Sequence, residues 1–247
     1  MHSTASIIRF VLIMTSIVAL ILAALQNGLK ARHDRNESLY SKKATLAAVS
    51  NHIDGDFSQL KDEDIQNIFD NQIVQEVVDN SGKVYSKEEL IELGVKDGLA
   101  ENIDLAKQQK KPVDERLMPV YKFTKADGSV YYILYARGKG LWDEIWGNIA
   151  LESDINTIAG VSFDHKAETP GLGAEIKDNK SWVRQFIGKK IYDDGKLRSV
   201  TVRKGGAKNE TYEVDGISGA TITGDGVTDM LEEDLQAYEP YLQTIKG

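Results

Sequence analysis

The sequence of 247 residues contains no cysteine at all. This absence excludes disulfide bonds, thiolate catalysis and iron–sulfur ligation by this chain. Basic residues are also in short supply, because 30 Lys and Arg against 38 Asp and Glu give a formal net charge of −8. Nucleic acids are bound by basic surfaces, so we expect no nucleic acid partner. The chain also lacks a G-x-G-x-x-G segment, and we therefore expect no Rossmann-type dinucleotide site in it.

Histidines are few, and their spacing does not suggest a metal site. No two of the four stand at an interval that would place both on one face of a helix as ligands. A structural or surface role is the better interpretation of each. The four are His2, His33, His52 and His165.

One long uncharged stretch lies near the N-terminus. The sixteen residues from Phe10 to Leu25 carry no charge, and Ile7 and Ile8 extend the apolar run beyond Arg9. Because the long Arg9 side chain can reach the lipid headgroups, the run approaches the roughly 20 residues that a bilayer requires. A cleaved signal peptide is the alternative. No clear A-x-A cleavage pattern follows the run, so we favour an uncleaved membrane anchor.

The charges beside this stretch conflict with one possible orientation in the membrane. Only Arg9 precedes the run, whereas five basic residues follow it. These are Lys30, Arg32, Arg35, Lys42 and Lys43. The positive-inside rule taken by itself places the rest of the chain in the cytoplasm, but the rule weakens where a long folded domain follows.

The rest of the chain has the composition and the pattern of an α+β protein. Its 41% of hydrophobic residues can bury a sizeable core. Helices are predicted at Glu37 to Ile53, within Phe57 to Asn80 and at Asn179 to Phe186, whereas Val84 to Lys111 shows no clear pattern. Strands are predicted at Val120 to Phe123, Ser129 to Ala136, Trp146 to Glu152, Thr157 to Phe163 and Leu197 to Arg203. Such hairpins before a C-terminal helix indicate a mostly antiparallel sheet with helices packed on it.

The segment Asp215-Gly216-Ile217-Ser218-Gly219-Ala220-Thr221 lies directly before that C-terminal helix. The apolar residues Val227, Leu231, Leu235 and Tyr238 recur at helical spacing, and we expect the helix to begin near Gly224 or Asp225. Gly219 and Ala220 leave room beside the Thr221 hydroxyl group, and a helix N-terminus favours an anion. The segment therefore suits a phosphate group attached to Thr221. The alternative is that its Ser and Thr residues are ordinary loop and N-cap residues.

A second segment, His165 to Ile176, contains a tight loop. It follows a predicted strand and includes Pro170-Gly171-Leu172-Gly173, a combination that exposes backbone groups. On its own, this loop is better interpreted as a plain turn than as a cofactor loop.

These two segments, in this order, resemble the FMN-binding domain of the NqrC family, which is named after one subunit of the Na+-translocating NADH:quinone reductase. The resemblance runs from about Met118 to Leu231 and includes Gly138 to Trp142 and Val202 to Ala207. Four matching segments in order are not expected by chance. The resemblance implies a transmembrane anchor at 1–28, a mainly helical linker at 29–117 and an FMN-binding domain at 118–247.

The resemblance also implies which residues hold the cofactor. Thr221 is the expected acceptor of a covalently attached FMN, and four neighbours are expected to line its phosphate group: Ser218, Gly219, Ala220 and Thr223. The ring or the ribityl chain is expected beside Thr169, Gly171, Leu172 and Gly173. Trp142 and Lys204 are further candidates. The alternative for Trp142 is core packing, and the alternative for Lys204 is a solvated residue of a strand. Glu168 is left out, because a loop carboxylate more often caps backbone N–H groups.

The function implied by the resemblance is that of an electron carrier and not of a complete catalyst. In this family, electrons pass through other subunits, reach a second covalent FMN and then quinone, and are coupled to Na+ pumping. The implied partners are the other subunits of the membrane complex and a flavin transferase that attaches the FMN. The implied location is the bacterial inner membrane, with the soluble domain on the extracytoplasmic side.

Three alternatives remain open at this point. One is the flavin-bearing subunit of the ion-translocating ferredoxin:NAD+ oxidoreductase, which shares the anchor and the threonine motif. Another is a membrane-anchored binding module that keeps the fold without the flavin. The third is an anchored scaffold without any ligand, which predicts a colourless protein.

Overall fold

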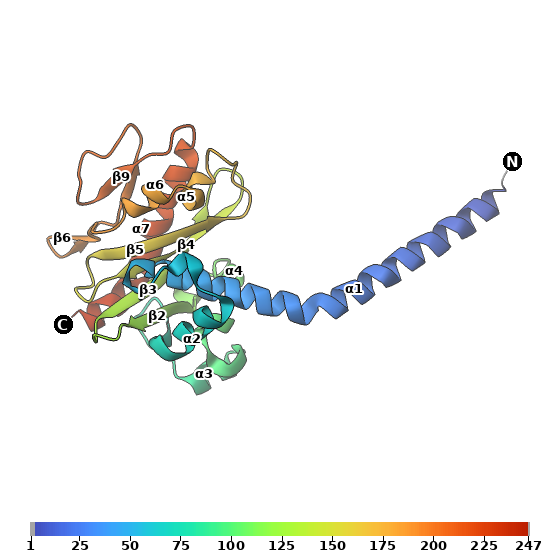
Figure 1. Cartoon of the computed structure of the whole chain (residues 1–247), viewed down its shortest axis with the longest axis horizontal. Helices are drawn as coiled ribbons and strands as arrows, with labels where there is room; N and C mark the ends of the chain where they lie inside the picture. The colour runs from blue at the N-terminus through green and yellow to red at the C-terminus, as the bar shows by residue number, and fades with distance from the viewer. Residues whose placement is uncertain (1–2, 247) are drawn as a thin grey trace. The chain divides into compact units, whose positions relative to one another are not determined.

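The computed structural model describes residues 3–246, so His2 lies outside the described residues. The chain divides into two compact units, Met1–Ser41 and Lys42–Gly247. Helix α1 (Thr4–Ala47) forms most of the first unit and continues into the second (Figure 1). Its apolar stretch is exposed, and the helix is long and apolar enough to cross a membrane. These are the length and composition that the predicted anchor requires.

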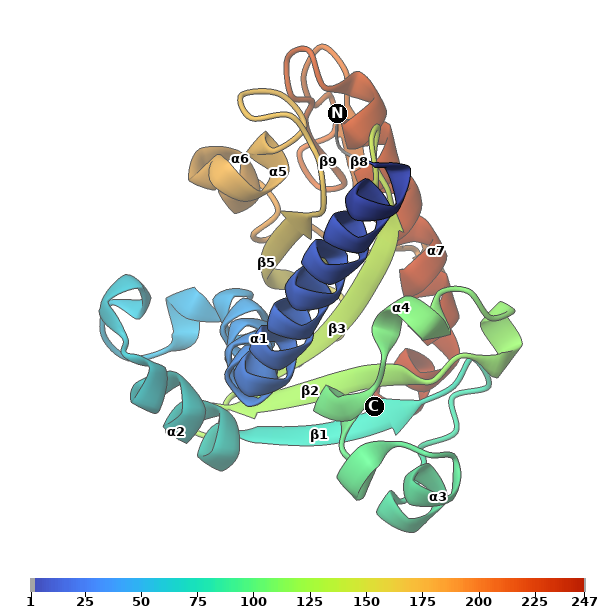
Figure 2. The same cartoon turned by 90° about the vertical axis from the view of Figure 1, so that its right-hand side faces the viewer.

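The second unit is built on one five-stranded antiparallel sheet. Figure 2 shows β1, β2, β3 and β5 labelled along this sheet, and the strands pair in the order β1-β2-β3-β4-β5. Their bounds are β1 (Ile73–Val78), β2 (Met118–Thr124), β3 (Val130–Lys139), β4 (Glu144–Leu151) and β5 (Ile158–His165). The turn between β2 and β3 is held by Asp127, whose carboxylate accepts the Ser129 N–H. The predicted α+β fold with a mostly antiparallel sheet is confirmed.

Both faces of this sheet are covered by other segments. Successive side chains in a strand point to opposite faces, so buried neighbours in one strand report on both faces. Leu134 in β3 belongs to the core that also contains Leu231 of helix α7 (Thr221–Ile245). The neighbouring Ile133 is fully buried outside that core, as is Leu46 near the end of α1. Helix α7 passes behind the strands in Figure 2. The sheet therefore has α7 on one face and earlier segments on the other.

The last turns of α1 are part of the second unit. The Ala44 carbonyl group accepts a hydrogen bond of 2.7 Å from the Ser162 hydroxyl group in β5. The Lys42 ammonium group is buried and lies 3.0 Å from the Glu101 carboxylate. Because a buried charge is costly without a partner, this pair holds the end of α1 in one place.

The segment from Phe57 to Asn80 corrects the prediction that it holds helices only. It contains η2 (Phe57–Gln59) and α2 (Asp62–Gln72), but the next residues form strand β1 and pair with β2 along their whole length. The run Ile-Val-Gln-Glu-Val-Val is rich in β-branched residues, which favour a strand. The paired strands β1 and β2 thus lie on opposite sides of the expected boundary between residues 117 and 118. The division into 29–117 and 118–247 stays a prediction.

Short elements make up the remaining connections. The segment before β2 holds α3 (Lys87–Glu92), η3 (Lys96–Gly98), η4 (Ala100–Asn102), α4 (Leu105–Gln108) and η5 (Val113–Glu115), and η1 (Ser50–His52) follows α1. The segment after β5 holds α5 (Glu175–Asp178), α6 (Lys180–Arg184), β6 (Tyr192–Asp193), β7 (Lys196–Leu197), β8 (Thr201–Arg203) and β9 (Glu213–Asp215). The strand predicted at 197–203 is therefore wrong as a single element. It is interrupted at Ser199, whose φ of 63° does not fit a strand.

Candidate functional site

The segment from Asp215 to Thr221 is fixed at its start by three neighbours. Strand β9 pairs in parallel with β8, and the Gly216 N–H donates to the Arg203 carbonyl group over 2.8 Å. The indole N–H of Trp182 donates to the Asp215 carbonyl group over 2.6 Å. The Asp215 N–H in turn donates to the Gln185 side chain over 2.9 Å. The strand that leads into the segment is thus held by β8 and by the region around α6.

The segment then turns sharply into α7. Gly219 has a φ of 76°, and a Cβ atom there would lie only 2.7 Å from a methyl group of Leu172. Glycine meets both requirements, because it adopts positive φ without strain and carries no Cβ. Helix α7 begins at Thr221 itself and not at Gly224 or Asp225 as expected. Thr221 therefore stands in the first turn of a 25-residue helix, where backbone N–H groups lack intrahelical acceptors.

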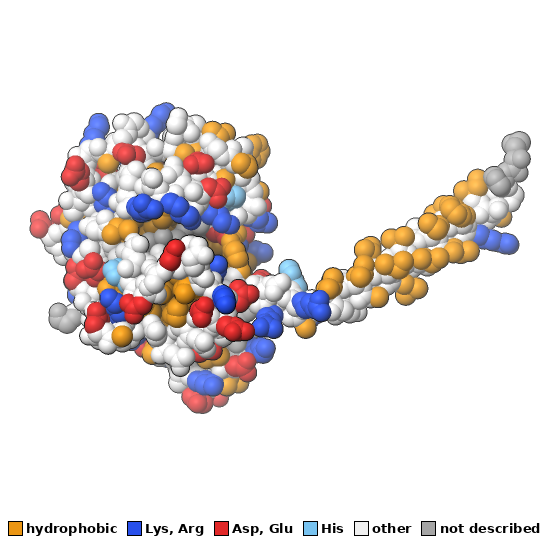
Figure 3. Space-filling view, viewed as in Figure 1, with side chains coloured by type: hydrophobic (Ala, Val, Ile, Leu, Met, Phe, Trp, Pro, Cys, Tyr) orange, Lys and Arg blue, Asp and Glu red, His pale blue; other side chains and the backbone are white. Residues whose placement is uncertain are grey.

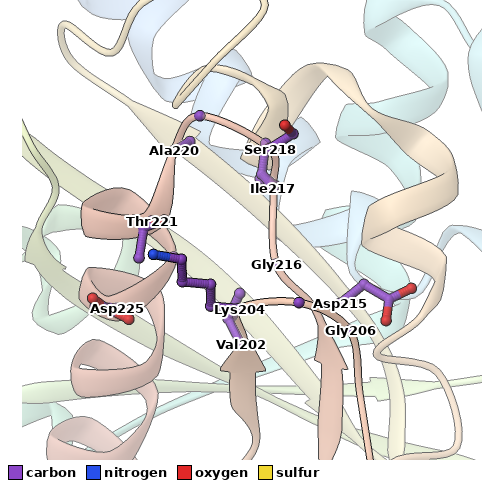
Figure 4. A pocket seen from close by; sticks show the side chains of 13 residues that line it. Val202, Lys204, Gly206, Asp215, Gly216, Ile217, Ser218, Ala220, Thr221 and Asp225 are labelled. Carbon is purple, nitrogen blue, oxygen red and sulfur yellow. The ribbon is translucent and has the colours of Figure 1, made fainter.

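An open hollow of about 550 Å³ lies beside this turn. It is lined by residues of β8, of the loop after β8, of the segment before α7 and of the first turn of α7. The lining consists of Val202, Lys204, Gly205, Gly206, Asp215, Gly216, Ile217, Ser218, Gly219, Ala220, Thr221, Gly224 and Asp225. Figure 4 shows the Lys204 side chain extending toward the start of α7, where Thr221 and Asp225 lie. The hollow therefore joins a threonine hydroxyl group, a helix N-terminus and one ammonium group.

The second segment lies against the first. Its loop closes on itself, because the N–H groups of Leu172 and Ala174 both donate to the Thr169 carbonyl group. The Glu168 carboxylate at its start is buried and accepts a hydrogen bond of 2.7 Å from the Thr223 hydroxyl group. Leu172 reaches the other side of the turn at Gly219. The two segments that carried the resemblance are thus brought together, although they are far apart in the sequence.

The individual predicted residues fall into two groups. Five of them line the hollow directly: Lys204, Ser218, Gly219, Ala220 and Thr221. The others lie beside it or behind it: Trp142, Thr169, Gly171, Leu172, Gly173 and Thr223. Among these, Thr223 is fully buried and faces Glu168, whereas Trp142 is 65% exposed. Core packing, the alternative considered for Trp142, is therefore wrong.

Four large apolar side chains are exposed near this site. Leu141 and Trp142 stand at the tip of the β3–β4 hairpin, Leu172 in the second segment and Ile222 in the first turn of α7. Their segments are tied together by contacts of Glu168 and of Gly219. Figure 3 shows hydrophobic side chains exposed at the upper right of the folded unit. An apolar planar group is a suitable ligand for such side chains.

Sequence reasoning missed two residues that support the site, Trp182 and Gln185, which hold the start of the motif. Glu168 was left off the cofactor list as a carboxylate that caps backbone N–H groups, and it does accept the Trp142 N–H, but its contact with Thr223 in α7 was not foreseen. No spacing or composition signal marks these contacts, because each of them joins residues distant in the sequence. The position of Glu168 directly before the Thr-Pro-Gly-Leu-Gly run was the one available hint. His165, interpreted as structural, accepts the Glu168 N–H on its ring nitrogen Nδ1 at 3.2 Å.

Comparison with known proteins shows which family this chain is similar to. A sequence description of the FMN-binding domain matches residues 140–236, which include both segments. The NqrC protein of the Na(+)-translocating NADH-quinone reductase of Neisseria meningitidis serogroup A is 32% identical to this chain over 249 residues. That alignment covers 96% of this chain and 92% of the relative. The chain belongs to the NqrC family.

Solved structures of the NqrC family agree with this assignment. The crystal structure of the NqrC protein from Parabacteroides distasonis superposes with a TM-score of 0.72 at 32% identity and covers 87% of this chain and 96% of that one. The alignment with the NqrC protein of Vibrio anguillarum is 37% identical over 153 residues and spans 60% of that relative's length. The resemblance drawn from the motifs is confirmed. Because the near full-length relative is an NqrC protein, the alternative from the ferredoxin:NAD+ oxidoreductase is not retained.

Proposed function

We propose that this chain carries FMN as a phosphoester on Thr221. The observation that supports the proposal is the position of Thr221, at a hollow where a strand ends and a long helix begins. The free N–H groups and the positive end of the helix dipole favour an anionic phosphodiester there. Lys204 adds a positive charge on the same hollow. The linkage forms between the Thr221 hydroxyl oxygen and the phosphorus of FMN, with loss of the elements of water.

The residues around Thr221 suit the two ends of FMN in different ways. Ser218, Gly219 and Ala220 border the hollow and would surround the phosphate group. Thr223 would support it from behind, since its hydroxyl group is engaged by Glu168. The ring and the ribityl chain would lie toward the remaining residues of the site, which are Trp142, Thr169, Gly171, Leu172 and Gly173. FMN supplies one- and two-electron redox chemistry, and the protein orients it and limits its access to water.

From the family name, we infer that the chain is an electron-carrying subunit of a membrane Na+-translocating NADH:quinone oxidoreductase. It is not a complete enzyme alone, because the described residues contain a single candidate membrane span and one span does not form an ion pathway. Electrons would enter from and leave toward other subunits of the complex. A flavin transferase would attach the FMN. A covalent link suits such a carrier, because the flavin cannot be lost while it exchanges electrons.

The test is the intact mass of the denatured full-length protein, produced in cells that contain a flavin transferase and purified in detergent. We expect the mass to exceed that of the polypeptide by one FMN less one water. Thr221→Val removes the hydroxyl group with little change of shape and should show the polypeptide mass alone. Thr221→Ser keeps a hydroxyl group and is the matched control, for which we expect at least partial modification.

Two results would contradict the proposal. One is an unmodified native protein in cells that flavinylate a known acceptor at the same time, which would favour a binding module without covalent flavin. The other is an unchanged mass increase in Thr221→Val, which would place the linkage on another residue. A colourless protein under these conditions would instead favour the scaffold alternative.

A further inference from the structure

Glu168 is a buried carboxylate whose two oxygen atoms are engaged by two different parts of the chain. One oxygen accepts the Trp142 backbone N–H at 2.9 Å, and Trp142 lies just before β4. The other accepts the Thr223 hydroxyl group at 2.7 Å, and Thr223 lies in the first turn of α7. The residue is only 5% exposed. Burying a carboxylate costs free energy because the group loses its hydration, and hydrogen bonds to the carboxylate compensate for that loss.

Two glycines show how closely the surrounding backbone approaches this carboxylate. A Cβ atom on Gly173 would lie 2.1 Å from one Glu168 oxygen and 2.7 Å from the Thr223 hydroxyl oxygen. A Cβ atom on Gly140 would lie 2.5 Å from the other Glu168 oxygen. The loop after β5 and the β3–β4 hairpin thus reach Glu168 where only hydrogen fits. The carboxylate fills the space between three backbone segments.

These three segments carry the residues proposed to surround the flavin. The hairpin tip presents Trp142, the loop presents Leu172, and the first turn of α7 presents Thr221. Among the hydrogen bonds between described residues at this junction, those of Glu168 connect the first and the third segments across the second. The exposed Trp142 side chain is not fixed by core packing. Its backbone is held by the contact with Glu168 and by the hydrogen bond between the Gly140 N–H and the Asp143 carbonyl group across the hairpin tip.

We propose that Glu168 is a positioning residue that assembles the flavin site by joining the hairpin tip, the loop after β5 and the first turn of α7. It acts through Trp142 and Thr223 and not by touching the reacting atoms. The contacts that join the segments are made by residues of this chain alone, so we expect them in the unmodified protein as well. The role toward flavin rests on the function proposed above, whereas the joining of the segments can be tested without it.

Glutamine at this position provides a sharp control. In Glu168→Gln the side-chain oxygen can still accept the Trp142 N–H, and the NH₂ group can donate to the Thr223 hydroxyl oxygen, which accepts as well as donates. This variant removes the negative charge and keeps both connections. Glu168→Ala removes both connections. Thr223→Val removes only the connection to α7 and leaves the one to Trp142.

The first measurement is amide hydrogen exchange of the hairpin tip in the unmodified full-length protein in detergent, followed by mass spectrometry. We expect protection at Trp142 to fall at least about tenfold in Glu168→Ala, a factor that corresponds to about 1.4 kcal/mol. Glu168→Gln and Thr223→Val should keep it. Glu175→Ala, which removes another glutamate of the same segment, should also leave it unchanged.

The second measurement is the fluorescence anisotropy of FMN on the modified full-length protein. We expect a lower anisotropy, and so a more mobile ring, in Glu168→Ala, a smaller decrease in Thr223→Val and the native value in Glu168→Gln. Unchanged exchange and anisotropy in Glu168→Ala would overturn the proposal. So would a Glu168→Gln variant as impaired as Glu168→Ala in both measurements, because charge and not connection would then be responsible. If the native protein took up no FMN, the function proposed above would fail, while hydrogen exchange would still decide whether Glu168 holds the hairpin tip.

Discussion

Among the described residues that line the hollow at Thr221, Lys204 is the only basic one. It is exposed, and Figure 4 shows its side chain extending toward the residue proposed to carry the phosphate. An exposed charge pair contributes only about 0.2–1 kcal/mol, because water screens it. Lys204 is therefore suited to assist the attachment of an anion and is not expected to determine it alone.

We predict that Lys204→Gln slows the attachment of FMN about two- to fivefold, the factor that corresponds to about 0.4–1 kcal/mol of lost attraction. The measurement is the initial rate at which the modified mass appears when purified protein is incubated with a flavin transferase and a flavin nucleotide that donates the FMN group. Lys208→Gln is the matched control, because Lys208 lies nearby and does not line the hollow. Equal slowing in both variants would point to general surface charge instead of Lys204.

At this same scale, the sequence indicated the segment proposed here to accept FMN and not the contacts that hold it. Thr221 could be named as a candidate because the proposed chemistry depends on consecutive residues, Gly219, Ala220 and Thr221. Glu168 and Thr223 are 55 positions apart, and Trp182 and Asp215 are 33 apart. Such contacts exist only once the sheet has brought the segments together, so no local pattern reports them.

At the scale of elements, one of the hydrogen bonds that join α7 to the sheet is made by a buried carboxylate of α7. The Asp234 carboxylate of α7 accepts the Arg137 N–H of β3 at 2.7 Å. Burial raises the pKa of Asp234 from 3.8 to about 7, although this hydrogen bond opposes the shift. A carboxyl group whose pKa is raised by folding destabilises the fold as the pH rises, because the unfolded chain ionises more easily. The contribution of the neutral Asp234 carboxyl group to the free energy of unfolding is fully present below pH 3.8. This contribution is lost progressively as the pH rises to about 7.

We therefore predict that Asp234→Asn stabilises the protein at pH 8 and that this gain shrinks as the pH falls toward 4. The Asn oxygen can still accept the Arg137 N–H, so the variant removes the ionisation and keeps the contact. Each unit of pKa shift corresponds to about 1.4 kcal/mol, so a gain of several degrees in Tm is expected at pH 8. Thermal unfolding of the full-length protein in detergent between pH 4.5 and pH 8 measures it.

Asp229→Asn is the control for this prediction, because Asp229 lies on the same helix and is exposed. A gain in Tm that is the same at every pH for Asp234→Asn would contradict the account, since it would not depend on ionisation. A loss of stability at pH 8 would show that the carboxylate is needed in its charged form.

The elements differ in how far the sequence predicted them. The strands β2 to β5 follow one another through short connections, so their alternating patterns and turns were sufficient. Strand β1 was mistaken for helix because it follows α2 directly and its partner β2 begins some forty residues later in the sequence. Strand β9 escaped prediction, and β8 was predicted only as the end of a longer strand, since neither exceeds three residues. Short strands with distant partners carry too little local pattern to be recognised.

At the scale of the whole molecule, the chain combines a helix that is long and apolar enough to span a membrane with a folded unit that begins at Lys42. In the proposed function, the side of the membrane on which this unit lies decides which partners can exchange electrons with the flavin. The basic residues after the apolar stretch, among them Lys30 and Arg32, favour the cytoplasmic side by the positive-inside rule. The rule is counted over short loops, and a long folded unit is translocated largely regardless of its charge. We therefore keep the extracytoplasmic side that the family resemblance implies.

The absence of cysteine makes this orientation directly measurable, because a single introduced cysteine is the only thiol in the chain. Lys180→Cys places it at an exposed position of the folded unit, and Ser3→Cys places it before the apolar stretch. We predict that a membrane-impermeant maleimide labels Lys180→Cys in intact spheroplasts and labels Ser3→Cys only after the membrane is permeabilised. The opposite pattern would place the unit in the cytoplasm. The flavin would then face the compartment of NADH, and the basic residues beyond the helix would have set the orientation after all.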